Sequence, residues 1–282
     1  MSLLEVENLH RVFSARGRGG AVTAVDHVNF TIEAGEAVGL VGESGSGKST
    51  IARILAGLER ADSGTIRLDG LDCLRVPRTS TNRMTRAQTV QMVFQDPNGS
   101  LDRRVPVGTM LQRTLLMHGR ALSKVQARAG AMQLLERVRL TEREFRAKPH
   151  ELSGGQRQRV AIARALAVEP KLVVLDEAVS ALDVSVQAQV LELLAEIQRD
   201  SGVSYLFVSH DLAVIQELCT RVLVLFRGAI VEQGETLQVL QAPQHPYSQL
   251  LIASTPGEGW DPERVVRDRM TFTQRMTLPG LL

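Results

Sequence analysis

The chain has 282 residues, of which 44% are hydrophobic and 23% charged, a composition typical of a folded globular protein. Its formal net charge of +2 gives no strong attraction to nucleic acid or acidic lipid, so we expect no nucleic-acid partner. The N-terminus lacks the basic start and unbroken apolar run of a signal peptide, and no apolar run approaches the ~20 residues that cross a bilayer. Cys73 and Cys219 lack metal-ligand spacing and are expected to be buried thiols.

Predicted strands and helices alternate along most of the chain. In chain order, strands are predicted at 3–6, 21–32, 36–42, 64–70, 89–96, 171–177, 204–210 and 221–226. Helices are predicted at 48–58, 153–168, 184–199 and from 211, with a mostly helical pattern over 105–140. The alternation predicts an α/β fold with a mostly parallel sheet. Residues 98–169 interrupt it and are predicted to form an inserted helical subdomain, while 14–20 form an exposed hairpin loop and the periodicity fades after 251.

The first motif that carries chemistry is "GESGSGKST", which fits G-x-x-x-x-G-K-[ST] between a predicted strand and a predicted helix. Its glycines let the backbone curl so that N–H groups face phosphates, and the helix dipole adds to anion binding. Lys48 would bring a positive charge to the β and γ phosphates, and the Ser49 hydroxyl would bind Mg²⁺. The alternative is a Gly/Ser-rich turn without a ligand. The predicted nucleotide-binding loop comprises Gly42, Glu43, Ser44, Gly45, Ser46, Gly47, Lys48, Ser49 and Thr50.

Two carboxylates end the predicted strand "KLVVLDE". Asp176 would hold Mg²⁺ through its water shell, and Glu177 would act as general base for an attacking water. Two acids after a strand are by themselves more typical of a solvated strand end. The phosphate-binding loop elsewhere in the chain favours the functional interpretation.

Gln95 and His210 also fall at the carboxyl ends of predicted strands. The Gln95 carbonyl oxygen could reach Mg²⁺ and the γ-phosphate, and the His210 imidazole would point into the same cleft. A lone histidine at a strand end is more often structural. Because the phosphate-binding loop and Asp176 are expected at the same sheet edge, the convergence of four polar groups favours a site.

The stretch "HELSGGQRQR" contains a second glycine pair before a predicted helix. Ser153 and Gln156 have the spacing of a capping box, which would explain both residues structurally. The box does not explain Gly154 and Gly155, which cost about 1 kcal/mol each in a helical first turn relative to alanine. We therefore expect an anion to approach this backbone. Since the chain's own loop already holds a nucleotide, that anion would belong to another copy.

Taken in order, the motifs "GESGSGKST", "VFQDP", "LSGGQRQR", "LVVLDE", "SALD" and "FVSH" give a sequence that resembles the ATP-binding subunits of ABC transporters over residues 3–251. The resemblance implies a P-loop NTPase with a RecA-like core, an antiparallel β subdomain and an inserted α-helical subdomain. Residues 1–251 would form the nucleotide-binding domain, and 252–282 a C-terminal tail. ATP and Mg²⁺ would be the cofactors.

The resemblance also implies head-to-tail dimers in which two ATP molecules lie between one subunit's phosphate-binding loop and the other's LSGGQ. The residues that would contact the γ-phosphate of the partner's ATP are Ser153, Gly154, Gly155 and Gln156. Asp183 would lie across the dimer seam, and Phe13 would stack on adenine, although the family more often has tyrosine there. The alternative for Phe13 is an apolar residue covering a strand edge.

Within the catalytic site, Glu177 would polarise the water while His210 and Lys48 stabilise the γ-phosphate. Ser49, Gln95 and Asp176 would organise Mg²⁺.

Three features indicate a branch of this family. The loop after the carboxylates reads Ala178-Val179 where the family usually has proline and threonine. The segments "SALDVSVQAQVL" and "HPYSQLLIASTP" resemble the oligopeptide, dipeptide and nickel importers. The alternative for the second segment is a helix end with Pro246 as the breaker.

The expected protein is an ATPase subunit of an importer on the cytoplasmic face of the inner membrane, with peptide as cargo, or nickel or another small solute as the alternative. Its partners would be a second ATPase subunit, identical or not, two integral membrane permease subunits docking beyond Gln95, and indirectly a substrate-binding protein. DNA-repair relatives typically carry coiled-coil or zinc insertions, and ribosome-associated ones carry two phosphate-binding loops. Neither feature occurs here, and a simple P-loop kinase would not explain LSGGQ.

Overall fold

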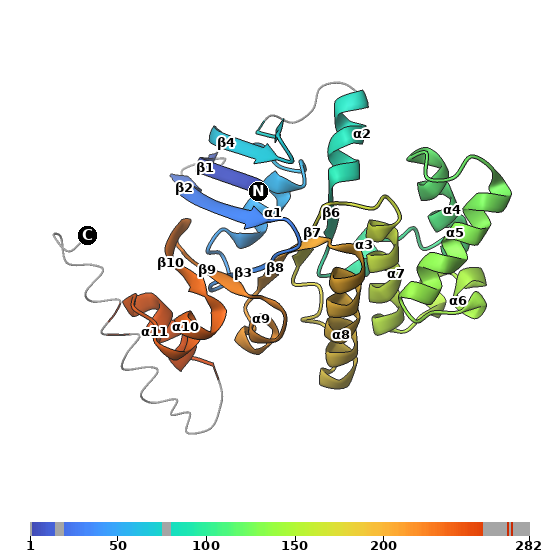
Figure 1. The fold of residues 1–282 in the computed structure, drawn as a ribbon. Coiled ribbons are helices and arrows are strands. Elements are labelled where there is room, and N and C mark those ends of the chain that lie inside the picture. The colour runs from blue at the N-terminus through green and yellow to red at the C-terminus, as the bar shows by residue number, and fades with distance from the viewer. Residues whose placement is uncertain (1, 15–19, 75–79, 256–269, 271, 273–282) are drawn as a thin grey trace.

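The computed structural model describes residues 2–14, 20–74, 80–255, 270 and 272. Its strands form two sheets (Figure 1), of which the first is four-stranded and antiparallel, in the order β2-β1-β4-β5. The bounds of these strands are β1 Ser2–Ser14, β2 Ala21–Glu33, β4 Ser63–Leu68 and β5 Leu71–Asp72. Most of the loop expected at 14–20 lies outside the described residues.

The second sheet has six strands in the order β10-β9-β3-β8-β7-β6, all parallel except β10, which pairs antiparallel with β9. Their bounds are β3 Ala37–Val41, β6 Val90–Val93, β7 Leu172–Asp176, β8 Ser204–Ser209, β9 Arg221–Phe226 and β10 Ala229–Glu235. Every residue of β3, β7 and β8 is buried, as expected for parallel strands covered on both faces. The predicted α/β class is confirmed.

The side chains of this sheet divide between two buried clusters. On β8, Tyr205 and Phe207 join one cluster and Leu206 and Val208 the other, because successive strand side chains point to opposite faces. Helix α1 packs in the second cluster, together with the antiparallel sheet, and α8 and α9 pack in the first. The bounds of these helices are α1 Lys48–Leu55, α8 Val184–Ser201 and α9 Leu212–Leu218. The parallel sheet is therefore sandwiched between two layers.

Residues 98–169, all of them described, contain no strand. The helices of this region and the one before β6 are α2 Ser80–Thr89, α3 Pro97–Ser100, α4 Val107–Met117, α5 Lys124–Arg137, α6 Glu142–Arg146, the 3₁₀ helix Pro149–Glu151 and α7 Gly154–Leu166. Figure 1 shows α4, α5 and α6 gathered at the side of the molecule away from β1 and β2. Helix α7 contacts both this group and β6. That these helices form a separate subdomain stays a prediction.

Two local expectations were wrong, and some elements were missed. Strand β6 ends at Val93 instead of reaching Gln95, since it is an edge strand that, among the described residues, pairs only with β7, and Val93 pairs with Leu175 one residue before β7 ends. Strand β10 and helix α2 were not predicted at all. Pro246 begins helix α11 (Pro246–Ala253), which follows α10 (Thr236–Gln241), and does not break a helix; a proline at the first helical position loses no hydrogen bond.

The C-terminal tail expected after residue 251 falls largely outside the described residues. No helix in the described part of the chain is both long and apolar enough to span a membrane. Cys73 and Cys219 are buried free thiols, as expected, and burial raises the pKa of Cys219 to about 12.

Candidate functional site

The phosphate-binding loop connects β3 to α1, and two of its glycines are required by close packing as well as by backbone angles. A Cβ on Gly42 would lie 2.2 Å from the carbonyl oxygen of Leu225, and a Cβ on Gly47 would lie 2.1 Å from that of Ala24. Gly47 is also the N-cap of α1, with φ of 110° and no side-chain cap hydrogen bond. The first amides of α1 therefore have no side-chain cap, which suits a bound anion.

Lys48 is almost completely buried, with 5% of its surface exposed. Its ammonium group donates hydrogen bonds to the carbonyl oxygens of Gly42, at 2.7 Å, and Glu43, at 2.8 Å. Burial lowers the pKa of Lys48, and the nearby charges of Glu177 and Asp176 oppose that shift. The lysine thus holds the loop and lies close to the carboxylates predicted to share its site.

Asp176, the last residue of β7, lies beside the start of α1. The Ser49 hydroxyl donates a hydrogen bond to its Oδ1 at 3.0 Å. Burial raises the pKa of Asp176, against the effect of that hydrogen bond. A buried carboxylate next to a hydroxyl supplies the oxygen ligands that Mg²⁺ prefers, so these residues fit the expected ion.

Glu177 and His210 come together at the same edge of the sheet. The Glu177 N–H donates to the carbonyl oxygen of Val208 on β8 at 2.9 Å, and the Glu177 carboxylate lies 3.3 Å from His210 Nδ1. Glu177 has a φ of +49°, a conformation that is uncommon outside glycine. A residue held in such a conformation at a cluster of polar groups is consistent with a functional constraint.

Ser180 is a site residue that the sequence reasoning missed. Its hydroxyl donates to the carbonyl oxygen of Glu177 at 2.9 Å and accepts from Gln95 Nε2 at 3.4 Å. Ser180 thereby connects Gln95 to the loop that carries Glu177. A serine inside a turn carries no sequence signal that would distinguish this role.

The loop after the carboxylates lacks the proline that the family usually has, and it is held by burial and hydrogen bonds. Ala178 and Val179 are each 2% exposed, and the Leu182 N–H donates to the Val179 carbonyl oxygen at 3.2 Å. Asp183 then caps α8, because its carboxylate accepts from the Ser185 hydroxyl at 2.7 Å and the Val186 N–H at 3.0 Å. These bonds lower the pKa of Asp183.

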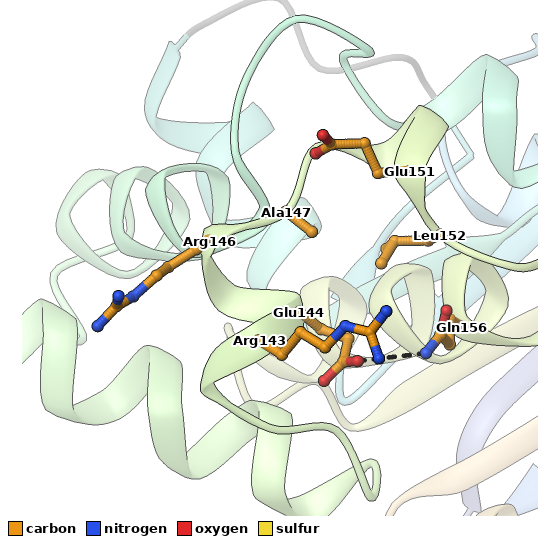
Figure 2. A pocket seen from close by; sticks show the side chains of 7 residues that line it. All are labelled: Arg143, Glu144, Arg146, Ala147, Glu151, Leu152 and Gln156. Carbon is orange, nitrogen blue, oxygen red and sulfur yellow. Dashed lines mark hydrogen bonds between the residues drawn. The ribbon is translucent and has the colours of Figure 1, made fainter.

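The start of α7 is a capping box, as its spacing predicted. Ser153 Oγ accepts from the Gln156 N–H at 3.2 Å, and the Gln156 side chain accepts from the Ser153 N–H at 2.9 Å. Gln156 Nε2 also donates a hydrogen bond to Glu144 at 3.2 Å. These two residues line a pocket of about 350 Å³, together with Arg143, Arg146 and Leu152 among others (Figure 2).

The two glycines that follow Ser153 differ. A Cβ on Gly155 would lie 2.4 Å from Cγ1 of Val186 on α8, whereas a Cβ on Gly154 would meet nothing closer than Leu182, at 3.9 Å. The expectation that both glycines await an anion is therefore unnecessary for Gly155, which has a packing reason within its own chain. The argument applies to Gly154 alone.

Phe13 lies on β1 and is 37% exposed. The guanidinium of Arg11 lies over its ring, 4.5 Å from the centroid. Arg11 is itself held by ion pairs to Glu59, at 3.0 Å, and Asp62, at 2.8 Å. One face of the ring is therefore covered by a cation, and a stacking role for Phe13 stays a prediction.

Tyr247 is a second residue that the sequence reasoning missed. It lies on α11, is 1% exposed, and its hydroxyl accepts a hydrogen bond at 2.9 Å from the N–H of Glu43 in the phosphate-binding loop. Its ring packs 4.2 Å from that of Phe226 at the end of β9. The C-terminal segment, interpreted from the sequence only as a branch marker, thus contacts the phosphate-binding loop directly.

Comparison with known proteins agrees with this geometry. The model of the ABC transporter family matches residues 25–180. The chain is 43% identical to the glutathione import ATP-binding protein GsiA of Pectobacterium atrosepticum over 98% of its own length, but it spans only 44% of that relative. It is 44% identical to the dipeptide transport ATP-binding protein DppF of Escherichia coli, covering 83% of this chain and 70% of the relative.

Among solved structures, the dimeric ATP-binding cassette MJ0796, bound to ADP and phosphate in a post-hydrolysis state, aligns with a TM-score of 0.75 and 29% identity. The alignment covers 83% of this chain and 98% of that one. The P-loop ABC ATPase fold is confirmed. The chain belongs to the ABC transporter family as an ATP-binding ATPase, and its relatives bear the names of glutathione and dipeptide import proteins.

Proposed function

We propose that this chain is the ATP-hydrolysing subunit of a peptide importer, driven by closure of two ATPase subunits around ATP. The observation that supports the proposal most strongly is the cluster at the edge of the parallel sheet. There Lys48, Ser49 and Asp176 lie together, and Glu177 contacts His210. This set contains the groups that phosphoryl transfer to water requires, namely a phosphate cradle, ligands for a metal ion and a base.

Each residue then has a chemical role. Lys48 and the uncapped amides of α1 hold the β and γ phosphates, and Ser49, Gln95 and Asp176 hold Mg²⁺. Mg²⁺, when bound, neutralises charge that develops on the phosphate oxygens. Glu177 accepts the proton of the attacking water, and His210, 3.3 Å from the Glu177 carboxylate, stabilises the γ-phosphate.

The second half of the ATP site would come from another subunit. In the proposal, Ser153, Gly154, Gly155 and Gln156 of one chain face the γ-phosphate bound by its partner. Asp183 would lie at the seam between the chains. Gly154 supports the idea because no packing contact among the described residues requires a glycine there. The dimeric state of the solved ABC cassette is consistent with such pairing.

The names of the relatives support the transport role and the cargo. They include glutathione, dipeptide and oligopeptide import proteins, which favours peptide over nickel as the cargo. Two membrane permease subunits would receive the movement through the segment beyond Gln95 and hold this chain at the cytoplasmic face of the membrane. Affinity purification in mild detergent should recover integral membrane proteins. Recovery of DNA or ribosomes instead would favour the non-transport relatives.

The test of the catalytic assignment is Glu177→Gln in the assembled transporter. We expect ATP binding to persist and steady-state hydrolysis to fall by about 10²–10⁴-fold, the usual contribution of a general base. Glu217→Gln, which alters an exposed carboxylate on α9, is the matched control and should hydrolyse ATP normally. Normal turnover by Glu177→Gln would show that another group is the base.

A further inference from the structure

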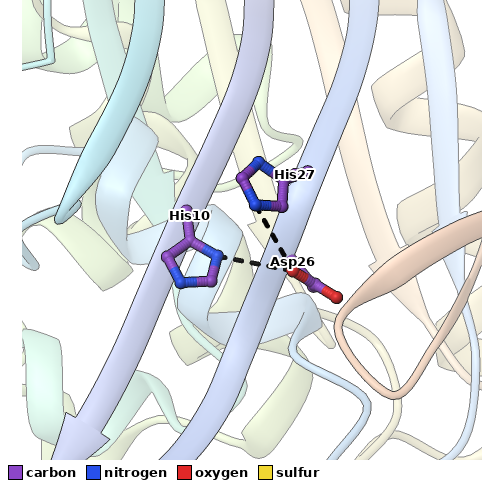
Figure 3. A group of neighbouring side chains, drawn as sticks. All are labelled: His10, Asp26 and His27. Atoms are coloured by element: carbon purple, nitrogen blue, oxygen red, sulfur yellow. Dashed lines mark ion pairs between the residues drawn. The ribbon is translucent and has the colours of Figure 1, made fainter.

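A β-bulge in the antiparallel sheet gathers His10, Asp26 and His27 (Figure 3). Strands β1 and β2 pair Leu9 with Val28 and then Arg11 with Val25, so the single residue His10 opposes both Asp26 and His27. A bulge of this kind re-aims side chains. His27 has a φ of +48°, an uncommon conformation for a residue with a side chain. Three potential metal ligands are thereby brought together on two strands.

The spacing of the ligand atoms suits a small ion. Asp26 Oδ1 lies 3.5 Å from His10 Nδ1 and 3.9 Å from His27 Nε2, and one ligand atom from each residue fits within 4.8 Å of the others. Tetrahedral coordination with metal–ligand bonds near 2.0–2.1 Å would separate neighbouring ligand atoms by about 3.3–3.5 Å. The two imidazole rings are stacked, with centroids 4.9 Å apart. Because an imidazole binds a metal ion in the plane of its ring, one of these rings must rotate out of the stack before both nitrogens can face the same ion.

The cluster also contains a buried nitrogen that makes no hydrogen bond of good geometry. His10 Nδ1 is buried, and within the described part of the chain it has an ion-pair contact with Asp26 Oδ1 at 3.5 Å but no hydrogen bond. A buried nitrogen of this kind calls for an explanation such as a bound ion or water. The nearest cation on the same strand does not take the carboxylate, because Arg11 pairs with Glu59 and Asp62. Asp26 is thus directed to the two histidines.

We propose that His10, Asp26 and His27 bind a divalent transition-metal ion of the Zn²⁺ type. Two imidazole nitrogens and one carboxylate are a ligand set for zinc, cobalt or nickel, whereas Mg²⁺ and Ca²⁺ prefer oxygen ligands throughout. The Asp26 and His27 side chains are 51% and 66% exposed, so an ion can enter from solvent and keep a water molecule as its fourth ligand.

This site is distinct from the Mg²⁺ ligands of the ATP site, although hydrogen bonds connect the two regions. The Asp26 N–H donates to the carbonyl oxygen of Gly228 at 2.8 Å, and the Gly228 N–H donates to that of Ser46 in the phosphate-binding loop at 2.9 Å. An ion at the bulge would restrict the motion of β2, the strand against which the phosphate-binding loop packs. Because the ion binds only the folded protein, it should raise the unfolding temperature.

The test uses the full chain without an affinity tag, nucleotide or Mg²⁺. We expect calorimetry with Zn²⁺ to show one ion per chain, and Co²⁺ to give the visible absorption of a tetrahedral complex. Asp26→Asn and His27→Ala should each weaken binding by about 10-fold or more and abolish the Zn²⁺-dependent rise in unfolding temperature.

Two histidine variants serve as matched controls, since any of the six histidines of the chain could bind an ion weakly. His150→Ala removes an exposed histidine elsewhere, and His210→Ala removes the one in the ATP site; both should retain binding at the bulge. The proposal is overturned by the absence of stoichiometric binding, by unchanged binding in Asp26→Asn and His27→Ala, or by binding that is lost in His210→Ala. Circular dichroism of every variant verifies that it is folded.

Discussion

The starts of α1 and α7 are both glycine-rich, yet they are built in opposite ways. Gly47 caps α1 in a left-handed conformation without any side-chain cap. Ser153 caps α7 with a reciprocal pair of hydrogen bonds to Gln156. The first helix therefore offers its amides to an anion, whereas the second has already satisfied one of them within its own chain.

The two helix starts therefore differ in what a second subunit must supply. The start of α1 lies beside Asp176, whose carboxylate accepts from Ser49, so phosphate and metal ligands come from a single chain. The start of α7 contacts α6 through Gln156 and α8 through Gly155. In our proposal its exposed backbone becomes functional only when another subunit presents a nucleotide.

Asp176 gives the largest effect expected on ATP binding, and it tests the region at the start of α1, whose phosphate and metal ligands come from a single chain. Asp176→Asn should weaken the Mg²⁺-dependent binding of ATP by about 10–100-fold, as expected for a group that orients an ion through its water shell. In the wild type, burial raises the pKa of Asp176, so the Mg²⁺ dependence should weaken as the pH falls towards that raised value and protonates the carboxyl. Isothermal titration at several pH values measures both effects.

ATP itself binds protons and Mg²⁺, and the variant serves as the control for that contribution. The component of the pH dependence that belongs to Asp176 must be missing from Asp176→Asn. A variant that keeps the full pH dependence of the wild type would contradict the assignment.

Substituting the two adjacent glycines of α7 one at a time distinguishes a packing role from a functional role. Gly155→Ala pushes a Cβ against Val186 and should destabilise the fold, because overpacking costs about 1–3 kcal/mol. Gly154→Ala meets no close atom and should be neutral or stabilising by up to about 1 kcal/mol, the helix propensity of alanine over glycine. Denaturant unfolding measures both changes.

The two glycine variants should differ in another way when ATP hydrolysis is measured. Gly154→Ala should lower hydrolysis several-fold despite its stable fold, because the added methyl group stands where the partner's phosphate would approach. Full activity in Gly154→Ala would remove the structural support for a shared site.

Tyr247→Phe should have the smallest effect and probes how the phosphate-binding loop is supported. The substitution removes the acceptor for the Glu43 N–H and should cost about 1 kcal/mol, the net value of a typical hydrogen bond. We expect ATP affinity to fall a few-fold with little change in hydrolysis at saturating ATP. An affinity equal to that of the wild type would show that the loop is held without this bond.

Much of the core could be predicted because its signals are local. Strands β3, β7 and β8 each contain a run of at least four apolar residues or glycine, and β9 matches the predicted range of residues 221–226. Strand β10, "AIVEQGE", contains charged residues and is only partly buried, so its apolar signal is weak. Helix α2, "STNRMTRAQT", has only Met84 and Ala87 as apolar residues, so its apolar signal is also weak. Both elements form because tertiary contacts outweigh weak local preference.

Some contacts of the candidate site could likewise be predicted from the sequence, and others could not. The phosphate-binding loop, Asp176, Gln95 and His210 were predicted to converge because the carboxyl ends of parallel strands meet at one edge. The contact of Tyr247 with Glu43 spans 204 positions of the chain and has no local signature. The packing of Val186 against Gly155 likewise depends on how α8 meets α7, which no periodicity in either segment reveals.

If one ATP site needs two chains, ATPase activity per chain must depend on protein concentration. With this chain and its partner ATPase purified in equal amounts, we expect specific activity to rise with concentration as dimers form. Activity per chain that stays constant on dilution into the monomeric range would contradict a shared ATP site.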